Sequence, residues 1–122
     1  MYTPEWLTRF AKDIAGNIVM SPEHGSVIQE YRKNYGITQK ELGQLMNLRR
    51  ETISRIENGK VNSTVYFIQN FVGALAIAEA TKAYCKGHEV EFPFLERIAK
   101  EFGISSNKLD QILGIALEKL EV

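Results

Sequence analysis

The sequence predicts an all-α protein, and three features support this. Apolar residues recur at the three- and four-residue spacing of a helix in one segment after another. Residue types that begin and end helices, such as Thr-Pro, Thr-x-x-Glu and Asn-Gly, separate these segments. A convincing strand pattern is missing, although residues 89–92 would allow one short extended piece.

The first helix is predicted to begin at Thr3 and to end near Ala15. Thr3 and Pro4 are the residue types preferred at the N-cap and at the first helical position. Three apolar residues follow at four-residue spacing as one stripe: Trp6, Phe10 and Ile14. Gly16-Asn17 is expected to end the helix. Residues 1–20 are therefore interpreted as a helical extension that covers the following domain or a partner subunit.

Residues 21–85 are predicted to form one domain. A short amphipathic helix closes at Gly36, and Thr38 to Glu41 has the form of a capping box at the start of the next helix. A third helix opens near Arg49 and stops at Asn58-Gly59.

A long helix follows, capped by Ser63 or Thr64 and running from Val65 to about Cys85. It is too rich in apolar residues to have only one covered side. It is therefore either the central helix of the core or part of a dimer interface.

The helix that begins at Thr38 and the helix that opens near Arg49 together meet the demands of a helix-turn-helix unit. Such a unit needs a small residue in its first helix, a residue tolerant of positive φ at the turn, and apolar residues at fixed offsets. Gly43 is the small residue, and Asn47 stands at the turn, where Asn tolerates left-handed geometry. The apolar positions that lock the two helices are Leu42, Met46, Leu48, Ile53 and Ile56.

Two strings, Gly-Ile-Thr-Gln-Lys-Glu-Leu at 36–42 and Ile-Ser-Arg-Ile-Glu-Asn-Gly-Lys at 53–60, resemble the XRE family of Cro/phage-repressor-like regulators. The resemblance covers about residues 28–64. The sequence has Gly43 where the family usually has Ala and Asn47 where it usually has Gly, and both substitutes are expected to meet the same steric requirement. Gly43 is expected to cost about 1 kcal/mol of helix stability relative to Ala. The resemblance implies a helix-turn-helix bundle of the phage-repressor type, with N-terminal and C-terminal helical extensions.

The resemblance also implies which residues contact DNA. In this family the second helix of the pair, here residues 49–58, lies in the major groove. The expected base-contacting residues are Arg50, Glu51, Thr52 and Arg55. The expected phosphate-contacting residues are Gln39, Arg49, Asn58 and Lys60. Arg32 and Glu57 are assigned to a structural, partly buried ion pair.

The distribution of charge fits a local DNA-binding patch. Fifteen Lys and Arg balance fifteen Asp and Glu, so the protein is not a histone-like protein that coats nucleic acid by bulk charge. Residues 22–64 hold seven basic and five acidic residues, whereas residues 65–122 hold six basic and eight acidic ones. The positive charge is therefore local.

Residues 86–122 are predicted to form a C-terminal helical hairpin, after a break at residues 86–93. The helix-turn-helix offsets recur at residues 95–112, with Ala99 as the small residue and Gly103 at the turn. Residues 91–121 hold six acidic and four basic residues, which disfavours phosphate binding. Packing or dimerisation is the preferred role, and a second DNA contact or an unknown partner is the alternative. The outer residues that a second contact would use are Ser105, Ser106, Asn107, Lys108 and Gln111.

Catalysis, metal binding and cofactors are not indicated. His24 and His88 are isolated in predicted loops, and no phosphate-binding loop or nucleophile with a base is evident. The single cysteine, Cys85, is expected to be a buried core residue and to form no disulfide. Without a signal peptide or membrane span, the protein is predicted to be cytoplasmic.

The sequence thus predicts a regulator of transcription that binds specific double-stranded DNA as a homodimer. The alternative is an antitoxin or bridging coactivator that acts through protein contacts of the helices after Val65.

Overall fold

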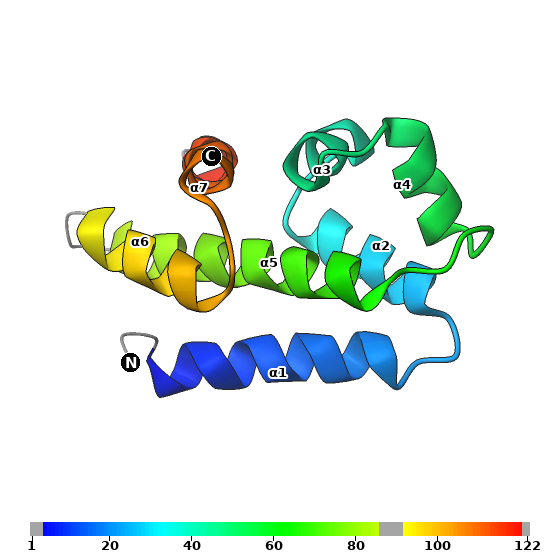
Figure 1. Cartoon of the computed structure of the whole chain (residues 1–122), viewed down its shortest axis with the longest axis horizontal. Coiled ribbons are helices and arrows are strands. Elements are labelled where there is room, and N and C mark those ends of the chain that lie inside the picture. Colours follow the sequence, from blue (N-terminus) through cyan, green and yellow to red (C-terminus); the bar gives the residue numbers. More distant parts are fainter. Residues whose placement is uncertain (1–3, 86–91, 121–122) are drawn as a thin grey trace.

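The computed structural model describes residues 4–85 and 92–120, which fold into helices without any strand (Figure 1). The all-α prediction is confirmed. The helices are α1 (Glu5–Val19), α2 (His24–Asn34), α3 (Gln39–Met46), α4 (Arg50–Glu57), α5 (Val65–Cys85), α6 (Phe92–Glu101) and α7 (Ser106–Leu120). None of the helices in this part of the chain combines the length and the apolar character that a membrane span requires.

Helix α1 is longer than predicted. It begins after Pro4, which occupies the N-cap position, and continues through Gly16-Asn17 to Val19. The predicted end near Ala15 was wrong because Ile18, beyond the glycine, is fully buried. Burial of one such side chain is worth about 1.5–3 kcal/mol, which exceeds the cost of about 1 kcal/mol for a glycine within a helix. Thr3, the expected cap, lies outside the described residues.

The buried face of α1 also differs from the predicted stripe. Trp6 is 44% exposed and Phe10 is only partly buried, whereas Ile14 is buried as expected. The residues that face the core are Leu7, Ala11, Ile14 and Ile18. The four-residue spacing that starts at Trp6 therefore gave the wrong register for the first half of the helix.

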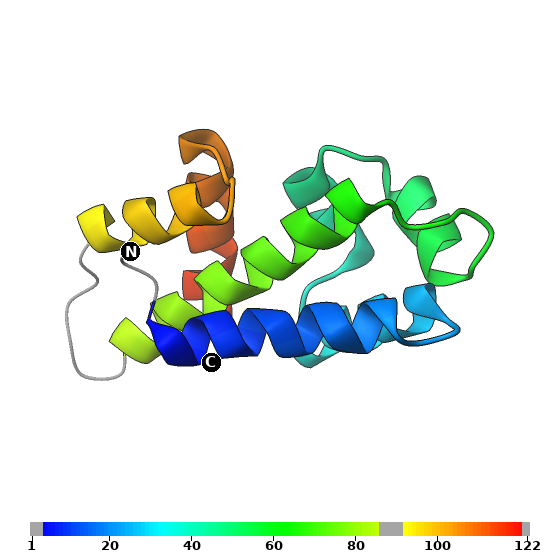
Figure 2. The ribbon, with the colours of Figure 1, turned by 60° about the horizontal axis from the view of Figure 1, so that its bottom comes forward.

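Helix α5 is the central helix of the core. Helix α1 lies beside it in the opposite direction, and α7 crosses it steeply, since α7 is seen end on in Figure 1 (compare Figure 2). Helices α3 and α6 also contact α5. The Oγ1 of Thr64 accepts a hydrogen bond from the backbone N–H of Phe67 at 3.0 Å, so Thr64 caps α5. A helix that is apolar on all sides requires such enclosure.

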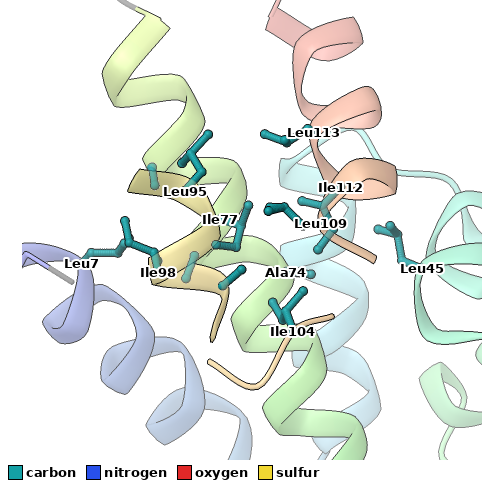
Figure 3. Packing of buried hydrophobic residues seen from close by; sticks show 13 residues of the cluster. Leu7, Leu45, Ala74, Ile77, Leu95, Ile98, Ile104, Leu109, Ile112 and Leu113 are labelled. Carbon is teal, nitrogen blue, oxygen red and sulfur yellow. The ribbon is translucent and has the colours of Figure 1, made fainter. Parts of the chain in front are cut away.

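The C-terminal helices pack against α5 by the predicted apolar positions. Figure 3 shows Leu95 and Ile98 of α6 and Leu109 and Ile112 of α7 gathered around Ile77. The turn between α6 and α7 contains Gly103 at φ 73°, a conformation that favours glycine. Much of the apolar surface of this hairpin is therefore already buried within one chain.

Helix α6 begins two residues earlier than predicted. Phe92 and Pro93 belong to its first turn, so the expected break does not extend to Pro93. Proline is tolerated there because the first backbone N–H groups of a helix have no partner within it. Of the possible extended piece at 89–92, Phe92 is helical and the rest lies outside the described residues, as do His88 and the side chain of Cys85.

Candidate nucleic-acid interface

Local sequence signals fix the ends of α3. The capping box is present: the Oγ1 of Thr38 accepts from the N–H of Glu41 at 3.0 Å, and the N–H of Thr38 donates to Glu41 Oε1 at 2.9 Å. Asn47 ends the helix in the left-handed region, at φ 57° and ψ 42°. Both predictions are confirmed. Arg49 is the N-cap residue of α4, so only Leu48 separates the two caps.

Three of the five apolar residues predicted to lock α3 against α4 are buried. Leu42 and Ile53 are almost fully enclosed and Ile56 is nearly so, whereas Met46 is only partly buried. Leu48 is 39% exposed, so its prediction as a buried locking residue was wrong. The turn that reverses the chain turns this side chain partly toward solvent.

Gly43 is more constrained than the sequence indicated. A Cβ atom at this position would lie 2.7 Å from the carbonyl oxygen of Leu48, closer than real Cβ atoms approach backbone. The turn between α3 and α4 therefore passes directly over Gly43. The expectation that Ala would meet the same steric requirement does not hold for this backbone.

Arg32 and Glu57 form a buried ion pair between α2 and the end of α4. Arg32 Nε donates to Glu57 Oε2 at 2.6 Å, and its Nη2 donates to Oε1 at 3.0 Å. Arg32 Nη1 donates to the carbonyl oxygen of Ile37 at 2.8 Å. Since both side chains are enclosed and hydrogen-bonded, the pair positions α4 and is not available to contact a ligand.

Gln39 belongs to the same network, which was not expected. Its Nε2 donates to Glu57 Oε1 at 3.0 Å, so the carboxylate joins α2, α3 and α4. Nothing in the local sequence pairs Gln39 with Glu57, because they meet only when α3 and α4 fold together. The amide of Gln39 has a second N–H, and the side chain is only partly buried. One donor is therefore left for an outside acceptor.

The predicted base-contacting residues lie on α4. Arg50, Glu51 and Arg55 are exposed, and Thr52 is partly buried. In the described part of the chain, neither Arg50 nor Arg55 has an ion-pair or hydrogen-bond partner for its side chain. Both guanidinium groups thus present all their donors to solvent.

Three of the four predicted phosphate-contacting residues flank this helix. Arg49 precedes it, Asn58 and Lys60 follow it, and all three side chains are exposed. Asn58 Nδ2 donates weakly to Ser54 Oγ at 3.4 Å. Because Arg32 neutralises Glu57, the exposed charge of α4 and its flanks is mainly positive. The basic residues are Arg49, Arg50, Arg55 and Lys60, against Glu51.

The second helix-turn-helix pattern has a weaker outer surface. Ser105, Ser106, Asn107 and Gln111 are exposed, and Lys108 is partly buried. Helix α7 has no arginine. The two helix-turn-helix patterns therefore have the same spacing of apolar residues, but their outer residues differ in charge.

His24 is not in a loop, as predicted, but is the first residue of α2, and its ring Nε2 lies 3.2 Å from the carbonyl oxygen of Val19. Among the residues that the structure describes, no three His, Cys, Asp or Glu side chains are grouped so that they could hold a metal ion.

Comparison with known proteins finds similarity in the part of the chain that contains α3 and α4. Residues 28–79, from α2 into α5, match the family described as "Helix-turn-helix". An "Uncharacterized HTH-type transcriptional regulator" of Archaeoglobus fulgidus is 47% identical over 38 residues, which are 31% of this chain and 54% of that protein. The chain therefore spans about half the length of this curated relative. No solved structure matches the chain.

The geometry and the match agree on the class of domain. A capped α3, a left-handed turn and α4 lie within the matched segment, and α2 and α5 enclose them. Residues 28–79 match a helix-turn-helix family and fold as a helix-turn-helix unit, in agreement with the predicted resemblance to the XRE family.

Proposed function

We propose that the protein is a sequence-specific regulator of transcription that inserts α4 into the major groove of double-stranded DNA. The observation that carries this proposal is the pair of unpartnered guanidinium groups, Arg50 and Arg55, on a helix held in place by the buried Arg32–Glu57 pair. The helix-turn-helix match and the name of the archaeal relative support it.

The exposed side chains of α4 suit base recognition. Arg50 and Arg55 each offer two parallel donors to O6 and N7 of guanine, and Glu51 can accept from N4 of cytosine. Thr52, at the edge of this face, is positioned for a thymine methyl group or a phosphate.

Phosphate contacts would fix the register of α4 in the groove. The free amide hydrogen of Gln39 and the backbone N–H groups at the start of α3 face one strand in this arrangement. Arg49, Asn58 and Lys60 contact the backbone at the two ends of α4.

An exposed apolar patch on the helix-turn-helix domain supports action as a homodimer. It consists of Leu48, Val61, Val65 and Tyr66, and the last two are 71% and 75% exposed. Leu48, Val61 and Tyr66 border one surface hollow of about 400 Å³, so they are neighbours. A patch of this kind on a soluble protein marks an interaction surface. With a second copy on it, the two α4 helices would read two half-sites.

In vitro selection of bound DNA from a random pool tests the proposal directly. The expected product is a pair of related half-sites with centres about one helical turn, ~34 Å, apart. Equal affinity for the selected duplex and for a scrambled duplex would refute sequence-specific regulation.

The same apolar patch supports a second candidate function. As an antitoxin or bridging coactivator, the protein would use Val65, Tyr66 and the helices that follow to bind a different protein. A monomer in sedimentation experiments, together with a single half-site from the DNA selection, would favour this candidate over the homodimer.

A further inference from the structure

A cavity of about 400 Å³ lies where helices of the helix-turn-helix domain meet α7. Residues of α2 and the segment after it, α3, α5 and α7 line it. Its volume falls within the range of about 300–1,000 Å³ that is usual for small-molecule sites. None of the proposed DNA contacts belongs to this cavity.

The cavity is hollow because its wall residues are small. Ala74 and Ala78 of α5 and Ala116 of α7 line it together, and larger side chains there would fill the space. Leu45 of α3 and Ile112 of α7 also line the cavity, and Leu45 points toward Ile112 (Figure 3). Most of the wall is therefore apolar.

One side of the cavity carries a carboxylate that forms no ion pair among the described residues. Tyr35 Oη donates to Glu79 Oε1 at 2.7 Å, and both side chains are partly buried. Burial, together with the nearby carboxylate, raises the pKa of Tyr35 well above its usual range, so the hydroxyl remains a donor. In the described part of the chain, no Lys, Arg or His lies within ion-pair distance of Glu79. Among the described residues Glu79 therefore forms no ion pair, and it has acceptor capacity left.

We propose that this cavity binds a small molecule that has an ammonium group and an apolar body. The ammonium group pairs with Glu79, which Tyr35 orients, and the apolar body packs against the alanine and leucine side chains. Pairing compensates the cost of partly burying a carboxylate.

Two kinds of compound share this chemistry. One is a simple apolar amine. The other is an apolar amino acid, whose carboxylate would pair with Lys82. Lys82 lies three residues after Glu79, on the same face of α5, and also lines the cavity.

The cavity wall is connected to the recognition helix. Ile37 lines the cavity, and its carbonyl oxygen accepts from the same Arg32 that holds Glu57 at the end of α4. Leu45 belongs to α3 itself. A ligand that joins α7 to Ile37 and Leu45 would therefore change the position or the mobility of α3 and α4. This consequence for DNA affinity rests on the proposed function, whereas the binding of the ligand does not.

Calorimetric titration and thermal unfolding of the full chain test the site. The probes are phenethylamine and isopentylamine as amines, and phenylalanine and leucine as amino acids. At least one class is expected to bind with saturation and to raise the Tm as its concentration increases. Glu79→Gln retains an acceptor for Tyr35 but removes the charge, and it should weaken binding by about tenfold or more.

Further variants show which of the two classes of compound binds and whether it binds in the cavity. Lys82→Ala should weaken amino-acid binding by about tenfold and leave amine binding unchanged. Ala78→Leu fills the cavity and should abolish binding of both classes. Glu118→Gln, an exposed carboxylate outside the cavity, is the matched control and should bind as the unmodified protein does.

Two results would overturn the ligand site. One is the absence of binding by all four probes at millimolar concentration. The other is binding that Glu79→Gln leaves unchanged in a variant whose circular dichroism and Tm show that it is folded. If a probe binds but leaves the affinity for the selected DNA unaltered, the coupling to α4 is refuted and the ligand site stands. Absence of specific DNA binding without any probe would refute the proposed function alone.

Discussion

Arg50 and Lys60 are both exposed cations, but their positions predict different effects on DNA binding. Arg50 is in the first turn of α4, whereas Lys60 follows its end. Arg50→Ala is expected to relax the preference at one base pair, at a cost of about 1–3 kcal/mol for the selected site. Lys60→Ala should weaken all duplexes alike and reduce the slope of log K against log salt concentration by about one. Titrations of selected and mismatched duplexes at several salt concentrations measure both effects.

The two variants serve as controls for each other, because each removes one positive charge. If both weaken selected and mismatched duplexes equally, the division into base-contacting and phosphate-contacting residues is wrong.

Glu57 and Glu51 lie on the same helix, but their substitution is expected to change the stability of the protein by very different amounts. Glu57 accepts three hydrogen bonds from Arg32 and Gln39, whereas Glu51 is exposed. Glu57→Ala leaves the Arg32 charge buried without its partner and is expected to lower the free energy of unfolding by about 3–5 kcal/mol. Glu51→Ala should change it by no more than about 0.5 kcal/mol. Urea denaturation followed by circular dichroism measures both values.

DNA titrations of the Glu57→Ala and Glu51→Ala variants distinguish a residue that supports α4 from a residue that contacts DNA. Glu51→Ala is expected to remain folded and to alter base preference. A Glu57→Ala protein as stable as the unmodified one would show that the ion pair does not hold α4.

At the scale of single residues, local chemistry predicted much of the site. The capping box at Thr38 and the left-handed Asn47 depend on neighbouring residues and were read correctly from them. The contact of Gln39 with Glu57 and the approach of Leu48 to Gly43 could not be predicted in the same way. Both depend on how closely α3 and α4 pack, which the type of residue does not specify.

Two helical glycines offer a matched test of how the elements pack. A Cβ at Gly25, in the first turn of α2, would clash with the carbonyl oxygen of Ile56, at the end of α4. Gly25→Ala therefore forces α2 away from α4 and is expected to destabilise the protein by about 1–3 kcal/mol or more. A Cβ at Gly16, within α1, would meet nothing within 4 Å. Gly16→Ala should stabilise the protein by about 1 kcal/mol.

Thermal and urea unfolding of both variants give the comparison. A Gly25→Ala protein that is as stable as Gly16→Ala would contradict the close contact between α2 and α4. Because Gly25 contacts the end of the recognition helix, its substitution should also weaken DNA binding, whereas the Gly16 change should not.

At the scale of elements, glycines marked helix ends with one exception. Gly59 and Gly103 have positive φ and stand at ends, as expected. Gly16 was expected to end α1, but it lies inside the helix because Ile18 beyond it packs into the core. A glycine permits an end but does not require one. Helix α1 continues through Gly16 because Ile18 extends its buried face, whereas Gly36 and Gly103 adopt positive φ and stand where helices end.

At the scale of the whole molecule, the order of helices could be predicted, but their partners could not. Sequence alone left α5 as either a core helix or a dimer interface, and it left packing or dimerisation open for the C-terminal hairpin. In the structure α1 and α7 both cover α5, so the apolar surfaces of α5 and α7 are largely buried within one chain. Interfaces between copies must therefore use surface that the intramolecular packing leaves open.

The apolar patch of Leu48, Val61, Val65 and Tyr66 is one such open surface, and it yields a prediction for assembly. In a two-fold interface each residue meets the same patch of the second copy, so a charge introduced there on one copy faces a like charge on the other. Tyr66→Lys should raise the dimer dissociation constant by about tenfold or more, while its exposed position leaves the fold intact. DNA with two half-sites should lose affinity, and a single half-site should not.

Analytical ultracentrifugation and titrations of the two duplexes measure these effects. Trp6→Lys, at an exposed apolar residue of α1 outside the patch, is the control and should leave both assembly and affinity unchanged. If Tyr66→Lys dimerises as strongly as Trp6→Lys, a second copy does not cover the patch. Two-site DNA would then have to be bound by monomers, each reading one half-site through its own α4, without the gain in affinity that linkage provides.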